Sequence, residues 1–196
     1  MGIQATPSKL HWNYFLALEN DLEVVSRYIE FSQSNFKTYS IELAHLLFAA
    51  SSEVDVIAKS LCKLLNPTMP RHTINDYRLT ITQGIPNLAN EQVFIKRYGL
   101  TLTPWKNWQG NTNPLWWRSY NNVKHERNQY FPEATLKNAL NALAGLLVVT
   151  FYYYKHLLPS TMNQVIANKD VMQELEPQSK LLKLSDEFYR GQLLSE

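Results

Sequence analysis

Apolar residues recur every three or four positions along much of the chain, which is the spacing of one face of an α-helix. This pattern predicts a first helix over 8–32 and a second over 38–65. The second helix stops before Pro67, because proline cannot continue a helix. Polar and acidic residues separate the apolar positions in both segments, so each helix is expected to have one buried face and one exposed face.

Two more helices are predicted in the second half of the chain. A helix over 114–128 follows an Asn-Pro pair, in which Asn caps free backbone N–H groups and Pro is tolerated at the first helical position. A long helix begins at Pro132 and runs to Pro159. Beyond residue 142 this helix is apolar on nearly every side, so it is expected at the centre of the fold.

The remaining segments are less regular. Prolines and glycines are frequent in 66–113, which predicts loops with short helices over 74–82 and 90–97. The tail, 159–196, has sparse apolar residues among charged ones and predicts one or two peripheral, partly mobile helices. No alternating strand pattern persists. The sequence therefore predicts an all-α fold: a four- to five-helix bundle over 8–158 with an irregular loop rich in Pro and Trp and a peripheral C-terminal helical tail.

Composition limits the class of protein. The chain has 196 residues, 45% of them hydrophobic and 18% charged, which is enough to build one core and to fold alone. A formal net charge of +2 gives no whole-molecule field that would drive the protein onto nucleic acid or a membrane. The most apolar run, 142–154, is shorter than the ~20 residues of a membrane span. No secretory signal pattern occurs, and the single cysteine, Cys62, suits a reducing compartment, so we expect a cytoplasmic protein.

Basic and aromatic residues are concentrated in the segment 96–127. It has six basic residues against one acid, and four of the five tryptophans. Basic groups attract phosphate and aromatic rings stack on unpaired bases, so this combination suits single-stranded nucleic acid. Trp105 and Trp108 are candidate base platforms. The alternative, that tryptophans of this segment such as Trp116 and Trp117 are core residues, stays open.

Arg118 and His125 fall on nearly the same face of the helix predicted over 114–128, since seven residues turn through about 700°. Asn121 and Asn122 lie between them. Histidine can act as general acid or base on RNA, arginine can neutralise a phosphorane, and asparagine can orient the phosphate. A separation of about 10 Å along the helix is too long for one site within a chain unless the helix is irregular or the side chains converge, and two copies about a two-fold axis can also bring the groups together.

The Arg118-x6-His125 pattern lies in the run Tyr120-Asn-Asn-Val-Lys-His-Glu-Arg127 and precedes an Ala- and Leu-rich helix. It resembles the HEPN superfamily of small α-helical domains, whose hallmark is Arg, four to six residues, then His in a late helix of the bundle. The resemblance covers roughly 10–158 as architecture, but its specific part is only about twenty residues. It implies a homodimer with a composite site. Many members are metal-independent endoribonucleases of toxin–antitoxin, phage-defence or RNA-processing systems, and others bind RNA or nucleotides without catalysis.

The resemblance also implies roles for individual residues. The catalytic set is Arg118, His125 and Asn121. The residues expected to contact RNA are Asn122, Lys124, Arg127, Trp105 and Trp108. Many active members have Asn, Asp or His directly after the arginine, where this chain has Ser119, so Asn121 or Asn122 would take that polar role. The expected substrate is single-stranded RNA or tRNA, and the expected partners are a second copy and an antitoxin or operon partner.

Other interpretations remain open. Five polar residues of the 38–65 segment share one stripe and would either line a cleft with His125 or form a solvated helix face: His45, Ser52 and Lys59, flanked by Glu42 and Asp55. The alternative functions are noncatalytic: binding of RNA, a nucleotide or a protein, or a structural dimer with Arg118 and His125 at its interface. No zinc-ligand spacing and no glycine-rich phosphate loop occurs, so no metal and no cofactor is expected.

Overall fold

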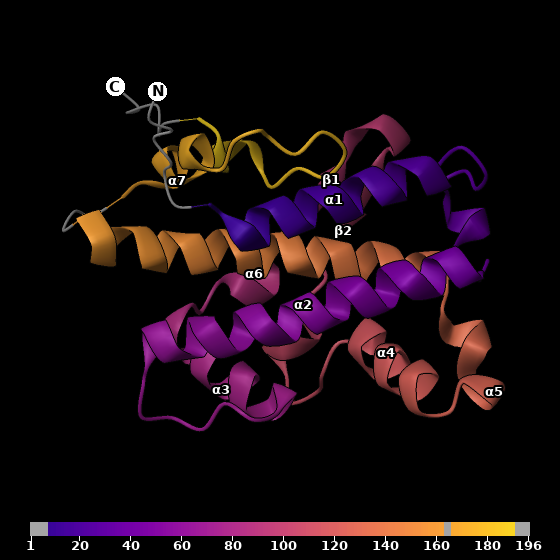
Figure 1. Cartoon of the computed structure of the whole chain (residues 1–196), viewed down its shortest axis with the longest axis horizontal. Helices are drawn as coiled ribbons and strands as arrows, with labels where there is room; N and C mark the ends of the chain where they lie inside the picture. The colour runs from indigo at the N-terminus through magenta and orange to yellow at the C-terminus, as the bar shows by residue number, and fades with distance from the viewer. Residues whose placement is uncertain (1–7, 163–165, 191–196) are drawn as a thin grey trace, which may run out of the picture.

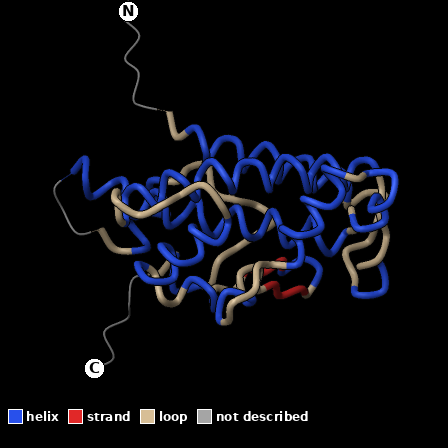
Figure 2. Tube along the Cα trace, turned by 90° about the horizontal axis from the view of Figure 1, so that it is seen from below, coloured by secondary structure: helices blue, strands red, loops and turns tan. Residues whose placement is uncertain are grey.

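Three long helices form the frame of the protein. The computed structural model describes residues 8–162 and 166–190, and its elements are shown in Figures 1 and 2. The helices are α1 (Leu10–Val25), α2 (Ile41–Leu65), α3 (Ile74–Gly84), α4 (Leu115–His125), α5 (Arg127–Tyr130), α6 (Leu136–Met162) and α7 (Asn168–Glu174). The strands are β1 (Val93–Ile95) and β2 (Leu100–Leu102). The predicted all-α class is confirmed, since helices dominate and the sheet has only two short strands.

Helices α1, α2 and α6 lie side by side along the length of the molecule (Figure 1). The backbone N–H of Leu136 donates to the carbonyl oxygen of Thr38 at 2.8 Å, so α2 and α6 start at the same end and run in the same direction. The ring of His11 at the start of α1 meets that of Tyr153 near the end of α6, so α1 runs the opposite way. As predicted from its apolar surface, α6 is central and almost wholly buried from Ala139 to Tyr154.

Capping groups set where two of the helices begin. The Ser40 hydroxyl accepts the backbone N–H of Leu43 at 3.1 Å and so satisfies a free donor of the first turn of α2. Helix α3 has a capping box, in which Thr73 accepts the N–H of Asp76 and the Asp76 carboxylate accepts the N–H of Thr73. These side chains fix the start of α3 beside α2.

The segment predicted to be a helix over 90–97 is instead the first strand of a hairpin, so that prediction was wrong. β1 pairs antiparallel with β2, and Gly99 makes the turn with a φ of +62°, a conformation that favours glycine. Phe94 and Lys183 then exchange backbone hydrogen bonds of 2.7 and 2.9 Å. Lys183, one of the two backbone partners of this segment, lies some ninety residues later in the chain. Local periodicity in the sequence therefore cannot reveal this pairing.

Helix boundaries also differ from the prediction. The first helix ends at Val25 rather than 32, and the helix predicted over 114–128 ends at His125, before the short α5. The central helix starts at Leu136 and continues past Pro159 to Met162. Pro159 lies in the last turn, where its missing N–H removes only one hydrogen bond of the helix.

The described part of the tail, 166–190, packs on the bundle and contributes to its core, although a peripheral, partly mobile tail was expected. Seven apolar side chains of the tail are buried in the same cluster as the three long helices: Val171, Met172, Leu175, Leu181, Leu182, Leu184 and Phe188. The carboxylate of Glu19 on α1 is buried and accepts the backbone N–H groups of residues 180–182 at 2.8–2.9 Å. A buried charge with this many donors holds the tail in place.

None of the helices in 8–162 and 166–190 has the length and apolar character needed to cross a bilayer.

Candidate functional site

Helix α4 has a buried aromatic face and an exposed polar face. Trp116, Trp117 and Tyr120 pack inward, and Val123 is fully buried. The residues on the outside recur at the helical spacing and form one exposed or half-buried stripe, which we call the α4 stripe: Leu115, Arg118, Asn122 and His125. The α4 stripe contains three of the site residues predicted from the sequence: Arg118, Asn122 and His125.

Arg118 and His125 are both exposed on the α4 stripe. Neither side chain has a hydrogen bond, ion pair or ring contact to any described residue. Their spacing along the regular helix is about 10 Å. Both groups are therefore available to a ligand or a second chain, and their backbone positions lie about two helical turns apart.

Asn122 connects the α4 stripe to the segment that precedes α6. Its amide nitrogen donates to the two carboxylate oxygens of Glu133 at 3.1 and 3.4 Å. Asn138 in turn donates to the Glu133 carbonyl oxygen at 2.8 Å. The Asn121 amide nitrogen donates to the carbonyl oxygen of Trp117 at 3.0 Å, which leaves the amide oxygen as the group that can meet a ligand.

Two basic residues at the end of α4 and in α5 lie against aromatic rings. The Lys124 ammonium is 3.3 Å from the Tyr120 hydroxyl and 5.3 Å from the centre of its ring. The Arg127 guanidinium is 5.5 Å from the centre of the Phe48 ring. Both side chains are exposed, so the rings hold the stems while the charged ends face solvent.

A polar cavity of about 410 Å³ opens next to the α4 stripe, between α2, the loop before α3 and α4. Its main polar lining residues are Ser52, Asp55, His72, Asn121 and Lys124. The predicted cleft between the 38–65 helix and the later helix therefore exists in part. It contains Ser52 and Asp55, but His125 is not one of its described lining residues.

Within this cavity Asp55 is already engaged by its neighbours. Its carboxylate accepts the Tyr77 hydroxyl at 2.8 Å and the Lys59 ammonium at 2.5 Å. Burial, and then the hydrogen bond to Asp55, raise the pKa of the Tyr77 hydroxyl, so it stays a donor. The Asp55–Lys59 pair neutralises one acidic charge, and the exposed Lys124 ammonium of this cavity has no ion pair with a carboxylate among the described residues.

His72 was not among the site residues predicted from the sequence. Its backbone N–H, like that of Thr73, donates to the Asp76 carboxylate at 2.9 Å, and these bonds lower the pKa of Asp76. The capping box therefore places the exposed His72 ring at the mouth of the cavity. The sequence does contain the Thr-x-x-Asp pattern of a capping box, which predicts a helix start beside His72. The pattern does not reveal that α2 and α4 lie across the cavity from this helix start.

Trp105 and Trp108 are not base platforms, and that prediction was wrong. Trp105 is 0% exposed and Trp108 is 4% exposed. Their rings pack at 4.2 Å between centres, and the Trp105 indole N–H donates to the Gly145 carbonyl oxygen on α6 at 3.2 Å. Neither ring face is open to a nucleic-acid base, because α6 and the core cover them.

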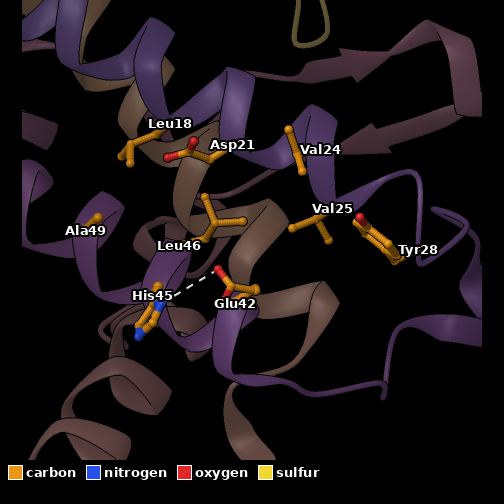
Figure 3. A pocket seen from close by; sticks show the side chains of 9 residues that line it. All are labelled: Leu18, Asp21, Val24, Val25, Tyr28, Glu42, His45, Leu46 and Ala49. Atoms are coloured by element: carbon orange, nitrogen blue, oxygen red, sulfur yellow. Dashed lines mark ion pairs between the residues drawn. The ribbon is translucent and has the colours of Figure 1, made fainter.

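The His45 end of the predicted α2 stripe faces a different cavity. This cavity, of about 480 Å³, lies between α1 and α2 and is lined largely by apolar side chains (Figure 3). His45 and Glu42 form a pair at 3.7 Å on its edge. It shares no described lining residue with the cavity beside α4, so the five polar residues of α2 do not form one site.

In 8–162 and 166–190, no group of three His, Cys, Asp or Glu side chains is placed to hold a metal ion. Cys62 is buried, and burial raises its pKa to about 11, so the thiol stays protonated at neutral pH. No protein-family model, curated protein or solved structure matches this chain.

Proposed function

We propose that this chain is a HEPN-like, metal-independent endoribonuclease of the toxin or phage-defence kind, with its site on the α4 stripe. The observation that carries the proposal is the state of Arg118 and His125. Both are exposed on one helix face, and neither has a partner among the described residues. An accessible arginine can stabilise the charge of a phosphorane, and an accessible imidazole can act as general base in phosphodiester cleavage.

In the proposed reaction, His125 accepts the proton of the RNA 2′-hydroxyl while that oxygen attacks the adjacent phosphorus. Arg118 stabilises the charge of the phosphorane. The bond from phosphorus to the 5′-oxygen then breaks, the leaving oxygen takes a proton from water, and His125 returns its proton to solvent. The products are a 2′,3′-cyclic phosphate and a free 5′-hydroxyl.

The site needs a second copy, because the Arg118 to His125 spacing of about 10 Å is too long for one phosphate. The midpoint of the pair lies between Asn121 and Asn122. A two-fold axis through that point, with the two α4 helices antiparallel, sets Arg118 of each copy beside His125 of the other. Leu115, which is 51% exposed at the start of the α4 stripe, supplies apolar contact for such an interface.

The test compares wild-type and His125→Ala protein with mixed tRNA and with single-stranded RNA in EDTA, followed by analysis of the product ends. Cleavage by the wild type alone, leaving 2′,3′-cyclic phosphates, is the expected result. Circular dichroism confirms that the variant is folded, as expected for an exposed residue without partners among the described residues. Equal cleavage by both proteins would contradict the assignment of His125.

A second candidate function is RNA binding without cleavage. It is favoured by one observation: no carboxylate or carbonyl group of the described residues orients the His125 imidazole, whereas catalytic histidines are commonly oriented by such a group. RNA binding that weakens with salt, with no product from the wild type, is the outcome that selects this function.

A further inference from the structure

A polar groove lies at the end of the bundle where α2 and α6 begin. It consists of two cavities, one of about 720 Å³ and one of about 420 Å³. Gln33, Phe36 and Lys137 line both cavities, so the two are adjacent. We call this the Phe36 groove. The first cavity extends along the start of α6 and the second reaches strand β2.

The charge of the Phe36 groove is positive. Lys37 and Lys137 are exposed, and neither ammonium has a partner among the described residues. None of the described residues that line either cavity is an aspartate or a glutamate. Two uncompensated cations in a concave surface attract a chain of phosphates more strongly than the same charges on a flat surface.

The uncharged lining suits nucleic-acid bases. Asn138 and Asn141 use their amide nitrogens within the protein, donating to the carbonyl oxygens of Glu133 and Lys137 at 2.8 Å, so their amide oxygens remain as acceptors. The Phe36 ring is half-buried against the core at the junction of the two cavities. An aromatic ring in the wall of a cavity that also contains lysines is a surface on which single-stranded bases can stack.

The Phe36 groove is also connected to the α4 stripe. Asn138 in the groove donates to the Glu133 carbonyl, and the Glu133 carboxylate accepts from Asn122 on the α4 stripe. The end of α4 and the starts of α2 and α6 lie at the same end of the molecule (Figure 1). The α4 stripe and the groove therefore lie at the same end of the molecule, within reach of one extended strand.

We propose that the Phe36 groove binds a single-stranded segment of RNA, with phosphates on Lys37 and Lys137 and a base against Phe36. Each cavity lies within the range of about 300–1,000 Å³ that holds a small ligand, so the groove accommodates a short stretch of nucleotides. The inference rests on the proposed function in taking RNA as the polyanion. It adds a strand-binding surface that contains no residue of the Arg-x6-His motif.

The experiment uses full-length protein carrying His125→Ala, so that the RNA probe stays intact. Binding of a fluorescein-labelled single-stranded RNA of about twelve nucleotides is measured by fluorescence anisotropy. We compare the parent with Lys37→Gln plus Lys137→Gln at salt concentrations from about 50 to 200 mM. Loss of two phosphate contacts on a single strand should lower the magnitude of the slope of log affinity against log salt by about 1.4. The affinity at the lower salt concentration should fall about tenfold.

The matched control is Lys63→Gln plus Lys169→Gln in the same parent. Both lysines are exposed without partners among the described residues and lie outside the groove, so the change in net charge is identical. Its affinity should stay within about twofold of the parent and its salt slope should not change. Phe36→Leu, which keeps apolar volume but removes the ring, should weaken binding several-fold with the slope unaltered. Thermal melting verifies that each variant is folded.

Equal affinities and slopes for the groove variant and its lysine control would overturn the proposal, as would a parent protein that binds no RNA. Failure of the nuclease assignment is recognised separately, in proteins with His125 intact. If the wild type leaves RNA uncut but the groove lysines still carry binding, the groove proposal stands and the nuclease assignment falls. If the wild type cleaves and the groove variant binds like its control, the groove proposal falls and the nuclease assignment stands.

Discussion

The carboxylate of Glu19 on α1 accepts the backbone N–H of Leu182, 163 residues later in the sequence, at 2.8 Å. Leu181 and Lys180 donate to the same carboxylate at 2.9 Å, and the Ser179 hydroxyl also donates to it. Glu19 is 3% exposed, so water does not reach these groups freely. This side chain therefore attaches the C-terminal segment to the first helix through a buried set of charge-assisted hydrogen bonds.

Replacing Glu19 by alanine should strongly destabilise the protein, because several buried N–H donors lose their acceptor. We expect the free energy of unfolding to fall by about 3 kcal/mol or more in urea denaturation. Glu19→Gln keeps one acceptor oxygen and should cost less. Glu23→Ala removes only an exposed pair with Arg97 at 3.7 Å and should change stability by less than about 0.5 kcal/mol. Similar losses for Glu19→Ala and Glu23→Ala would show that the buried carboxylate is not a major attachment.

Gly145 on α6 should not tolerate a methyl group. A Cβ atom there would lie 3.0 Å from Cζ2 of Trp116 and 3.5 Å from the ring of Trp105. Two buried indoles cannot move without disturbing the core, so Gly145→Ala should cost about 1–3 kcal/mol. At Gly110 the nearest atom to an added Cβ is the Asn107 carbonyl oxygen at 3.9 Å. Gly110→Ala is therefore the control, with an expected change near zero, and both are measured by thermal and urea unfolding.

Glu91 should make the stability of the protein depend on pH. Burial raises the pKa of this carboxyl above its ordinary value, against the smaller effect of the Tyr152 hydroxyl, which donates to it at 2.5 Å. The folded state therefore binds this proton more tightly than the unfolded state does. The contribution of protonated Glu91 to the stability of the folded protein is present below the ordinary pKa of glutamate. It is lost as the pH rises through the raised pKa of the folded state.

Glu91→Gln mimics the protonated carboxyl and should be more stable than the wild type at neutral pH. The difference should shrink as the pH falls below the ordinary pKa of glutamate, and unfolding measured across this range checks it. Glu174→Gln, an exposed residue paired with Lys9, is the control and should show no such pH-dependent gain. A constant difference between Glu91→Gln and the wild type at every pH would contradict this account.

A mixture of two inactive variants should recover cleavage if the site is shared between copies. In a dimer of Arg118→Ala with His125→Ala, one site lacks both groups and the other has the intact arginine of one copy and the intact histidine of its partner. Random exchange makes half of the dimers mixed, so about a quarter of wild-type activity should return. The assay is RNA cleavage after unfolding and refolding the two variants together. Activity equal to that of the unmixed variants would indicate that each copy uses its own pair.

Much of the helical frame could be predicted from the sequence because it depends on local periodicity. Helices α2 and α6 repeat apolar residues at helical spacing over many turns, and Ser40 and Pro67 mark the limits of α2. The outward position of Arg118 and His125 follows from the same periodicity. These features need no knowledge of what lies across the fold.

Other features depend on contacts between distant residues. The extended form of β1 comes from pairing with β2 and then with Lys183, and the burial of Trp105 comes from its approach to Gly145. The charge and aromatic content of 96–127 predicted an open nucleic-acid surface, whereas Trp105 and Trp108 are in the core. Composition records which groups a segment has, but burial is decided by the elements that pack against it.

The attachment of residues 180–182 to Glu19 also bears on how the chain acquires its structure during synthesis. The first helix emerges from the ribosome long before its partners for Glu19 have been made. Until residue 182 is released, this carboxylate must remain in contact with water, and α1 cannot be buried in its final form. The burial of α1 is therefore completed only when residues 180–182 have been released, and an interrupted product lacking that segment would present α1 to chaperones and proteases.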